Sequence, residues 1–368
     1  MDTSDEYIHF DSQGVCNRCL EYPKLILPSW KNGKGHEKEL SSIIRKIKKA
    51  GEGREYDCLL GLSGGLDSCY LLHLAVKEWG LRPYVLHIDA GWNLPVAVQN
   101  IDKMCSKLGV ALHIEKMNWN EMREIQKAFF RTGHASLDAP QDHAFIALTD
   151  KYAQRLGVKY ILNGYNISTE VVSDPISWAN GAGFTGDGAY IKDVIKKHCE
   201  IPVHNYTFTS GFKHKVWTPY ILGIKTLTPL NFVPFIKDDA TRLLEHEYGY
   251  QAYGQKHFED MLTKFLEGWW LPTRFGYDIR KAQLSSLITT GQMTRDKALE
   301  ILQDPPLSED DSKELFTKVA QKLEVSEDQL KEWHNLPKAD IKYHGNKLIY
   351  SLGIKLFTLL GTEKRIRQ

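Results

Sequence analysis

Apolar and polar positions alternate along the chain in blocks that predict strands followed by helices. The stretch 57–62 is short, mostly apolar and preceded by a charged segment, as a buried strand of a parallel sheet is. Residues 67–76 then place apolar side chains at helical spacing. Further strands are predicted at 83–88, 111–115 and 159–162, and further helices at 37–50, 96–108, 121–130 and 144–156. This alternation predicts an α/β fold with a doubly wound parallel sheet.

The first strand and helix are joined by Ser63-Gly64-Gly65-Leu66-Asp67-Ser68, which we interpret as a phosphate-binding loop. Its glycines lack Cβ atoms, so their N–H groups can approach a phosphate, and the helix N-terminus adds partial positive charge. That charge contributes only about 0.3–1 kcal/mol per anion, so tight binding needs cations nearby. The loop has neither the lysine of a P-loop nor the glycine spacing of a dinucleotide fingerprint. In the plainer alternative, Asp67 and Ser68 merely cap a helix.

Polar residues also follow later strands, at the sheet edge where parallel sheets bind ligands. Asp89 follows the second strand and is expected to meet the adenine or ribose of a nucleotide, unless it only closes a turn. Asn163-Gly164-Tyr165-Asn166 follows the fourth strand, and its glycine allows close backbone approach. We assign Asn163 and Gly164 to the nucleotide. The tyrosine and second asparagine are assigned to the substrate, together with Asp142 at the start of a helix.

Charged and aromatic side chains cluster downstream, between residues 253 and 281. The candidates for chemistry there are Lys256, His257, Glu259, Arg274, Arg280 and Lys281. Cations are what the weak loop dipole lacks, and an arginine fork matches phosphate or carboxylate. Alone, this block would be read as a mixed-charge surface. Beside a phosphate loop, we expect some of these residues to be functional.

The composition, with 42% apolar and 25% charged residues, is that of an ordinary globular protein. A formal net charge of +1 argues against a nucleic-acid footprint over the whole protein. The acidic N-terminus is no signal peptide, and the apolar run 348–360 is broken by Lys355 and too short to span a bilayer. The sequence therefore predicts a cytoplasmic protein that binds neither nucleic acid nor membrane.

Six cysteines are scattered along the chain, and only Cys16 and Cys19 are paired in sequence. A Cys-x-x-Cys knuckle is half of a tetrahedral zinc site, which usually recruits a second Cys or His pair. No matching pair follows nearby. The alternative reading is two unliganded thiols in a turn.

We divide the chain into three parts. Residues 1–50 form an N-terminal knuckle and helix, 51–240 a nucleotide-binding α/β domain, and 241–368 a substrate-binding and helical region. The glycine- and aromatic-rich stretch 171–219 shows no clear periodicity and is predicted to be a lid or substrate loop. Near the C-terminus, Ser308 and Ser326 are expected to begin amphipathic helices.

The phosphate loop matches the Ser-Gly-Gly-x-Asp-Ser loop of the ATP pyrophosphatases. This PP-loop superfamily has the adenine nucleotide alpha hydrolase-like fold and includes GMP, NAD and asparagine synthetases. As far as about Ile301, the chain also resembles the N-acetyl sugar amidotransferases. The stretches that carry this resemblance are Gly14–Cys19, Ser63–Ser68, Asn163–Asn166, Lys256–Glu259, Leu271–Lys281 and Ile288–Arg295.

The resemblance implies an ATP-dependent ligase of lipopolysaccharide O-antigen biosynthesis or flagellin glycosylation. Such enzymes convert an acetamido group into an acetamidino group, giving derivatives of mannuronic, pseudaminic or legionaminic acid. ATP with Mg²⁺ would adenylate the acetamide oxygen, and ammonia would then displace AMP.

The resemblance also implies roles for individual residues. The loop residues Ser63, Gly64, Gly65, Leu66 and Ser68 would hold pyrophosphate, while Asp67 orients the loop or the Mg²⁺. Lys256 and Arg280 would bind pyrophosphate or an acidic group of the sugar, which Arg274 and Lys281 also contact. His257 and Glu259 would move protons or bond sugar hydroxyls.

The chain shows no glutaminase signature, so ammonia is expected from a separate glutaminase pair similar to imidazole glycerol phosphate synthase. Family members usually carry a second Cys-x-x-Cys just upstream of the stretch that begins at Met1, so a zinc site at Cys16 and Cys19 would be incomplete here. Homo-oligomerisation is left open.

Two rival functions are weighed against this one. A PP-loop tRNA-modifying enzyme, of the thiolation or lysidine type, is disfavoured by the net charge of +1 and by the unpaired Cys199. A non-catalytic ATP-binding module is disfavoured by the cations downstream. Release of pyrophosphate would separate the enzyme from the module.

Overall fold

The computed structural model describes residues 1–175, 178 and 185–339, and the apolar run 348–360 lies outside these described residues. The strands are β1 (Cys58–Gly61), β2 (Pro83–Asp89), β3 (Leu112–Lys116), β4 (Tyr160–Leu162) and β5 (Lys225–Leu227). The α-helices are α1 (Asn17–Glu21), α2 (Leu27–Trp30), α3 (Glu37–Ala50), α4 (Leu66–His73), α5 (Pro95–Leu108), α6 (Trp119–Phe130), α7 (Ala139–Leu156), α8 (Ile167–Glu170), α9 (Gly188–His198), α10 (Lys237–Tyr248), α11 (Met261–Phe265), α12 (Leu271–Phe275), α13 (Arg280–Thr289), α14 (Arg295–Ile301), α15 (Glu309–Leu323) and α16 (Glu327–Asn335). Shorter π-helical or 3₁₀ segments are Tyr22–Ile26, Lys31–Gly33, Leu74–Glu78, Lys213–Ile221, Pro229–Phe232 and Leu266–Trp270.

The five strands form one parallel sheet in the order β3-β2-β1-β4-β5. Leu59 of β1 pairs with Tyr84 of β2 on one side and with Ile161 of β4 on the other. The chain builds outward from β1 to β3 and then returns to the opposite side of β1. This reversal opens a crevice beyond the carboxyl ends of β1 and β4, where ligands bind in such sheets. The predicted α/β doubly wound fold is confirmed.

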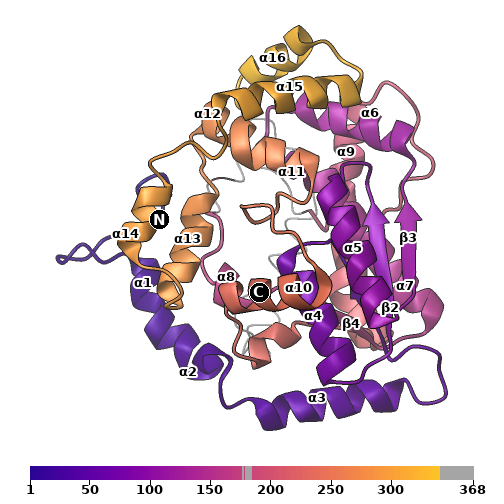
Figure 1. Ribbon diagram of the computed structural model, residues 1–368. Helices are drawn as coiled ribbons and strands as arrows, with labels where there is room; N and C mark the ends of the chain where they lie inside the picture. Colours follow the sequence, from indigo (N-terminus) through magenta and orange to yellow (C-terminus); the bar gives the residue numbers. More distant parts are fainter. Residues whose placement is uncertain (176–177, 179–184, 340–368) are drawn as a thin grey trace.

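Helices cover both faces of the sheet, so its central strand is apolar throughout (Figure 1). Cys58 and Leu60 are fully buried in a core shared with α3, α4, α5 and α10. Leu59 is fully buried on the opposite face, in a core shared with α7. Successive side chains of a strand point to opposite faces, which explains why the strand shows no polar alternation.

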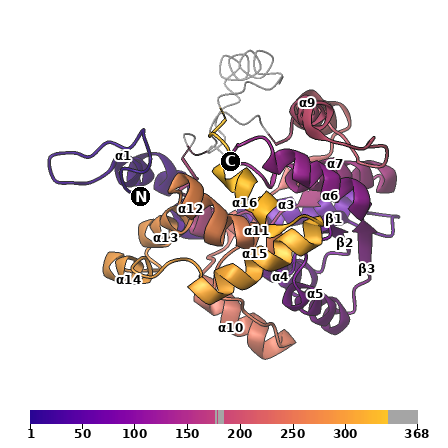
Figure 2. The same ribbon diagram turned by 90° about the horizontal axis from the view of Figure 1, so that it is seen from above.

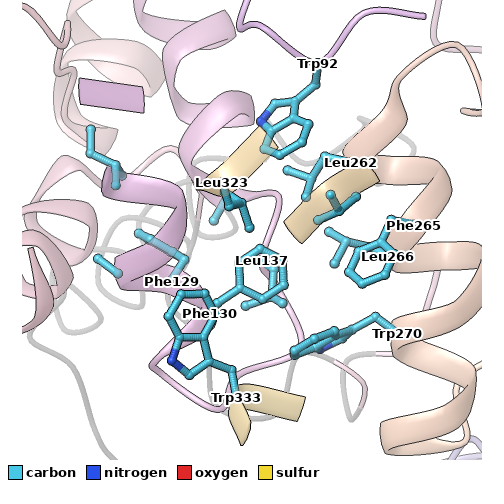
Figure 3. Close-up of a cluster of buried hydrophobic side chains, with 14 of the residues drawn as sticks. Trp92, Phe129, Phe130, Leu137, Leu262, Phe265, Leu266, Trp270, Leu323 and Trp333 are labelled. Carbon is cyan, nitrogen blue, oxygen red and sulfur yellow. The ribbon is translucent and has the colours of Figure 1, made fainter. Parts of the chain in front are cut away.

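A third hydrophobic core lies away from the sheet, where α6, α11, α15 and α16 meet (Figure 3). Phe130 of α6 stacks on Trp333 of α16, with ring centroids 5.9 Å apart. Trp270, in the π-helical turn between α11 and α12, meets Phe130 edge-on at 4.9 Å and is 1% exposed. Figure 2 shows α15 and α16 running across α11 from above. This core joins the C-terminal helices to the body that carries the sheet.

The predicted starts of α15 and α16 are confirmed by their capping bonds. The Ser308 hydroxyl accepts the Asp311 N–H, and the Ser326 hydroxyl accepts the Gln329 N–H. A serine at this position satisfies a backbone donor that the helix itself leaves without a partner. The two caps place α15 and α16 in the register that buries Leu323 and Leu330 in the third core.

The prediction that 171–219 is irregular was wrong for two parts of it that the structure describes. Helix α9 begins at Asp187, whose side chain accepts the Ala189 N–H, and it buries Tyr190, Ile191 and Val194. A π-helical segment, Lys213–Ile221, follows. The apolar spacing of α9 is present in the sequence, but the glycines before it and the aromatic residues around it hide so short a helix. Residues 179–184 of this stretch lie outside the described residues.

No helix in the described parts of the chain is both long and apolar enough to cross a bilayer.

Candidate functional site

A cavity of about 1050 Å³ lies at the crevice between β1 and β4. Its walls come from the carboxyl ends of β1, β2 and β4, from α8, from the start of α10, from residues 250–260 and from α13. The first predicted loop and the downstream charged block therefore face the same space. Elements from the two ends of the sequence build one site.

The phosphate loop is held in shape by its own serines. The Ser63 N–H donates to Ser68 Oγ at 3.2 Å, and the Gly65 N–H donates to Ser63 Oγ at 3.2 Å. Ser68 Oγ in turn donates to the Gly65 carbonyl at 3.2 Å. The two hydroxyls lie 3.1 Å apart. This internal network fixes the turn between β1 and α4, as an anion cradle of backbone N–H groups requires.

Two glycines lie where another part of the backbone approaches closely. Gly64 has φ +85°, and a Cβ there would lie 2.6 Å from the Ala97 carbonyl oxygen at the start of α5. A Cβ on Gly164, after β4, would lie 3.1 Å from the backbone nitrogen of Ser68. The loops after β1 and β4 are therefore packed against each other at the switch point.

Lys256 is held between two carboxylates at the edge of the loop. Its ammonium lies 2.8 Å from Asp67 Oδ2 and 2.5 Å from Glu170 Oε1, and it donates to Thr169 Oγ1 at 3.0 Å. Burial opposes its charge, but the two carboxylates raise the pKa of Lys256. This cation is neutralised by the protein itself. Its first effect is to fix Asp67 against α8, which connects the charged block to the loop.

Glu259 lies directly against the phosphate loop. Ser63 Oγ donates to its Oε1 at 3.3 Å, and a Cβ on Gly65 would lie 2.7 Å from the same oxygen. The Tyr253 hydroxyl lies 3.1 Å from that Cβ position as well. Burial and the Glu259 carboxylate raise the pKa of Tyr253, so its hydroxyl stays protonated. Both side chains face the cradle.

His257 forms an ion pair across the cavity wall. Its Nδ1 lies 3.0 Å from Glu267 Oε1, and its φ of +69° is unusual for a residue with a side chain. Burial disfavours the charged imidazole, yet the Glu267 carboxylate raises the pKa of His257 to about 9. The pair places a protonated imidazole beside several carboxyl groups of the cavity wall.

Those carboxyl groups form an acidic wall of Asp138, Asp142, Asp174 and Asp260. Burial is the main cause that raises the pKa of Asp138, Asp174 and Asp260 to about 6 each, and it raises the pKa of Asp142 as well. Asp260 accepts the Thr263 N–H at 2.8 Å and begins α11. Groups that titrate near neutral pH are suited to exchange protons with a bound ligand.

The raised pKa of Asp138 predicts a pH-dependent difference from its asparagine variant. The folded state binds the proton more tightly than the unfolded state, so this contribution to stability is complete below pH 3.8 and is lost as the pH rises through about 6. Asp138→Asn cannot ionise, so the variant does not lose this contribution to stability as the pH rises. We therefore expect the variant to exceed the wild type in free energy of unfolding by about 1–3 kcal/mol at pH 7 and to match it near pH 4.

Urea unfolding at the two pH values measures this difference. Asp102→Asn, on the exposed face of α5, serves as the control and is expected to follow the wild type at both. A constant difference between Asp138→Asn and the wild type from pH 4 to 7 would contradict the prediction.

The other predicted site residues divide into two groups. The cavity is lined by Leu66, Asn163, Gly164, Tyr165, Asp142 and Arg280. Outside its lining are Asp89, whose carboxylate accepts the Gly91 N–H at 2.8 Å, and Asn166, which caps α8. Arg280 forms an ion pair with Asp278 at 2.7 Å and donates to the Asp304 carbonyl. Its role toward a ligand stays a prediction.

Arg274 and Lys281 serve other parts of the molecule. The Arg274 guanidinium donates to the Leu336 carbonyl at 2.8 Å and so ties α12 to the end of α16. Lys281 forms an ion pair with Asp2 at 2.7 Å and anchors the N-terminal segment to α13. Neither side chain lines the cavity. Their predicted contacts with the substrate gain no support from this placement.

The N-terminal cysteines do not line the cavity: Cys16 precedes α1 and Cys19 lies within it. Cys16 is buried and Cys19 is exposed, and partial burial together with a hydrogen bond to Cys16 raises the pKa of Cys19. Within the described residues, no three Cys, His, Asp or Glu side chains are grouped to hold a metal ion. The prediction of zinc therefore gains no third ligand here.

Sequence reasoning missed several residues of the site, of which Lys237 is the most informative. It is the first residue of α10 and lines the cavity beside Thr241. Burial lowers the pKa of Lys237, and no side-chain ion pair or hydrogen bond of its ammonium is found among the described residues. A lysine that follows the last strand and opens an amphipathic helix is the signal that could have indicated it. Glu170, Asp138, Asp174 and Glu267 were also missed.

Two family models match separate parts of the chain. Residues 57–143 match the phosphoadenosine phosphosulfate reductase domain, and residues 259–357 match the "LPS biosynthesis protein WbpG-like, C-terminal domain". The first match contains β1, the phosphate loop and β2. The second begins at Glu259, the residue whose carboxylate meets Ser63. The two matches therefore meet in the cavity.

Three similar proteins illustrate the relationship. The uncharacterized protein MJ1599 of Methanocaldococcus jannaschii is 26% identical over 165 residues, which are 44% of this chain and 54% of that protein. A glutamine-hydrolyzing GMP synthase of Chlamydia caviae is 27% identical over 242 residues, 63% of this chain and 39% of that enzyme. The solved NH₃-dependent NAD synthetase of Campylobacter jejuni is 14% identical with a TM-score of 0.30, covering 74% of this chain and 99% of that one.

The chain thus spans about half, or less, of the length of these curated relatives. The loop sequence, its place after the central strand and the two family matches agree with the resemblance predicted above. Residues 57–143, which contain the phosphate loop, are therefore similar to the phosphoadenosine phosphosulfate reductase domain, and residues 259–357 are similar to the C-terminal domain of a WbpG-like lipopolysaccharide biosynthesis protein.

Proposed function

We propose that this protein is an ATP-dependent amidotransferase that converts the acetamido group of a bacterial surface-polysaccharide or flagellar sugar into an acetamidino group. One observation carries the proposal. The WbpG-like segment begins at Glu259, and the side chain of that residue lies on the phosphate loop. The part of the chain related to lipopolysaccharide biosynthesis therefore faces the same cavity as the loop typical of ATP pyrophosphatases.

The reaction needs activation because an acetamide is a poor electrophile. Its oxygen attacks the α-phosphate of ATP, the bond to the β-phosphate breaks, and pyrophosphate leaves. Ammonia adds to the carbon of the imidoyl adenylate, loses a proton, and AMP departs with the original oxygen. The sugar keeps its carbon skeleton and exchanges O for NH. The loop would hold the pyrophosphate through backbone N–H groups and the hydroxyls of Ser63 and Ser68.

The acidic wall supports the step with ammonia. Ammonium must lose a proton to become a nucleophile, and the wall provides carboxyl groups whose pKa lies near 6. His257 and Glu267 lie beside them. We propose that the carboxylates of the acidic wall accept the protons released as ammonia adds. A separate glutaminase, similar to the imidazole glycerol phosphate synthase pair, is the proposed source of ammonia.

Lys237 is expected to bind the phosphates of ATP. Its ammonium lines the cavity without a partner among the described residues, whereas Lys256 and Arg280 are already paired with carboxylates. Lys237→Met should weaken ATP binding about 10-fold, because a charge-assisted hydrogen bond is lost. Isothermal titration with a non-hydrolysable ATP analogue measures the change. Lys225→Met, at an exposed position of β5, is the control, and equal affinities of Lys237→Met and wild type would contradict the prediction.

The function is tested by a substrate screen with ATP, Mg²⁺ and ammonium, read by mass spectrometry. The candidates are UDP-linked diacetamido uronic acids and free or CMP-linked diacetamido nonulosonates. A product lighter by the difference between O and NH, with equimolar AMP and pyrophosphate, would support the proposal and identify the sugar. If ATP is cleaved and no sugar changes, the sugar substrate is wrong. If ATP binds and is never cleaved, the enzyme assignment itself fails.

A further inference from the structure

Glu259 places a negative charge where a phosphate loop should receive an anion. Its Oε1 accepts the Ser63 hydroxyl at 3.3 Å and lies 2.7 Å from the Cβ position of Gly65. A carboxylate and a polyphosphate repel each other across so short a distance unless a cation lies between them. The cradle therefore needs a positive group that the loop does not supply.

The backbone at Glu259 is fixed, so the carboxylate is not a freely moving surface group. The Leu94 N–H donates to the Glu259 carbonyl at 3.0 Å, and the Met261 N–H donates to the Trp92 carbonyl at 2.8 Å. Between them, Asn93 and Asp260 form an antiparallel bridge. The segment after β2 thus holds residues 259–261 as a strand partner. The neighbouring side chain of Phe258 is buried and anchors the segment from the other side.

The second carboxylate oxygen of Glu259, Oε2, is buried and lacks a hydrogen-bond partner among the described residues. A buried carboxylate oxygen without a partner is costly, and a bound ion is one way in which its contacts are completed. The nearest ammonium in sequence, that of Lys256, is already shared by Asp67 and Glu170. Among the described residues, Glu259 forms no ion pair with a cationic side chain.

We propose that Glu259 is a protein ligand of a Mg²⁺ ion that also binds the phosphate oxygens of ATP. This inference rests on the proposed function, because ATP supplies the remaining ligands. Mg²⁺ is commonly held by one or two carboxylates together with substrate phosphates and water, rather than by a cage of protein ligands. The described residues contain no group of three such ligands, so the ion should arrive with the nucleotide. The Glu259 carboxylate would then repel metal-free ATP and favour binding of the Mg²⁺ complex of ATP.

The test compares nucleotide affinity with and without the metal. Isothermal titration with α,β-methylene-ATP, in EDTA and in excess Mg²⁺, gives an enhancement factor for wild type, Glu259→Gln and Glu259→Asp. We expect Glu259→Gln to lose at least about 10-fold of the Mg²⁺ enhancement and to bind the metal-free analogue as tightly as wild type or more tightly. Glu259→Asp keeps the charge on a shorter side chain and should fall in between. Glu245→Gln, on the exposed side of α10, is the control and should match wild type.

The outcomes separate this inference from the function on which it rests. An unchanged Mg²⁺ enhancement in Glu259→Gln overturns the inference while nucleotide binding stands. An equal loss of affinity with and without Mg²⁺ also overturns it, since Glu259 would then only shape the loop. If wild type binds no nucleotide under either condition, the proposed function and the inference fall together. Electron paramagnetic resonance of Mn²⁺ with the same variants provides a second measurement. Glu259→Gln should lose the signal of Mn²⁺ that is bound to the protein in the presence of nucleotide.

Discussion

Replacing Gly64 by alanine is expected to lower ATP-dependent release of pyrophosphate by about 100-fold, because the loop loses the geometry that aims its N–H groups. Gly64 adopts φ +85°, which costs other residues about 1–3 kcal/mol. The new Cβ would also lie 2.6 Å from the Ala97 carbonyl oxygen, and the nearest atoms all belong to the backbone of Ala97, so no flexible side chain can move aside. The loop must therefore shift away from the start of α5.

Gly53→Ala separates the effect of backbone strain at positive φ from the effect of the clash with Ala97. Gly53 has a similar φ of +72°, but a Cβ there has nothing within 4 Å. This variant should lose a comparable amount of stability through backbone strain and keep the pyrophosphate release of wild type. Steady-state release by both variants, together with their denaturation curves, makes the comparison. Full activity of a folded Gly64→Ala would mean that the loop does not hold the phosphates.

Replacing Trp270 by alanine is expected to reduce the free energy of unfolding by about 3–5 kcal/mol. The indole is 1% exposed and touches the rings of Phe130, Phe265 and His334 in the third core (Figure 3). Its Nε1 has no hydrogen-bond partner among the described residues, so the loss is one of packing and of the cavity left behind. Chemical denaturation measures the change.

Trp217→Ala is the matched control for this change. Its side chain is 44% exposed, so the variant should stay within about 0.5 kcal/mol of wild type. A similar small effect for Trp270→Ala would show that the C-terminal helices are not joined to the rest of the molecule through this core.

The elements around the phosphate loop were predictable because their signals are local. A run of apolar residues, two glycines and a helix start lie within twelve residues of the sequence, from Asp57 to Ser68. Helix starts at Ser308 and Ser326 follow the same logic, since a cap acts on a backbone group three residues away. β5 was missed because a strand of three residues, with Lys225 and Thr226 exposed, carries no periodic pattern.

The partners of the charged side chains could not be read from the sequence. Lys256 meets Asp67 across 189 positions and Glu170 across 86, and nothing in local pattern links them. The charged block between residues 253 and 281 predicted that cations would gather near the loop. It did not predict that Lys256 would be neutralised while Lys237 was left without a partner among the described residues. The ion pair of Arg280 with Asp278 is easier to anticipate from the sequence, because the two residues are only two positions apart.

Because the chain is made from its N-terminus, the antiparallel bridge between Asn93 and Asp260 can form only late in synthesis. A ribosome that adds about 5–20 residues per second produces Lys256 roughly 10–40 s after Asp67, given their separation of 189 positions. During that interval Asp67 lacks its ammonium, and the segment after β2 lacks its strand partner. A nascent chain therefore has a phosphate loop and no finished site.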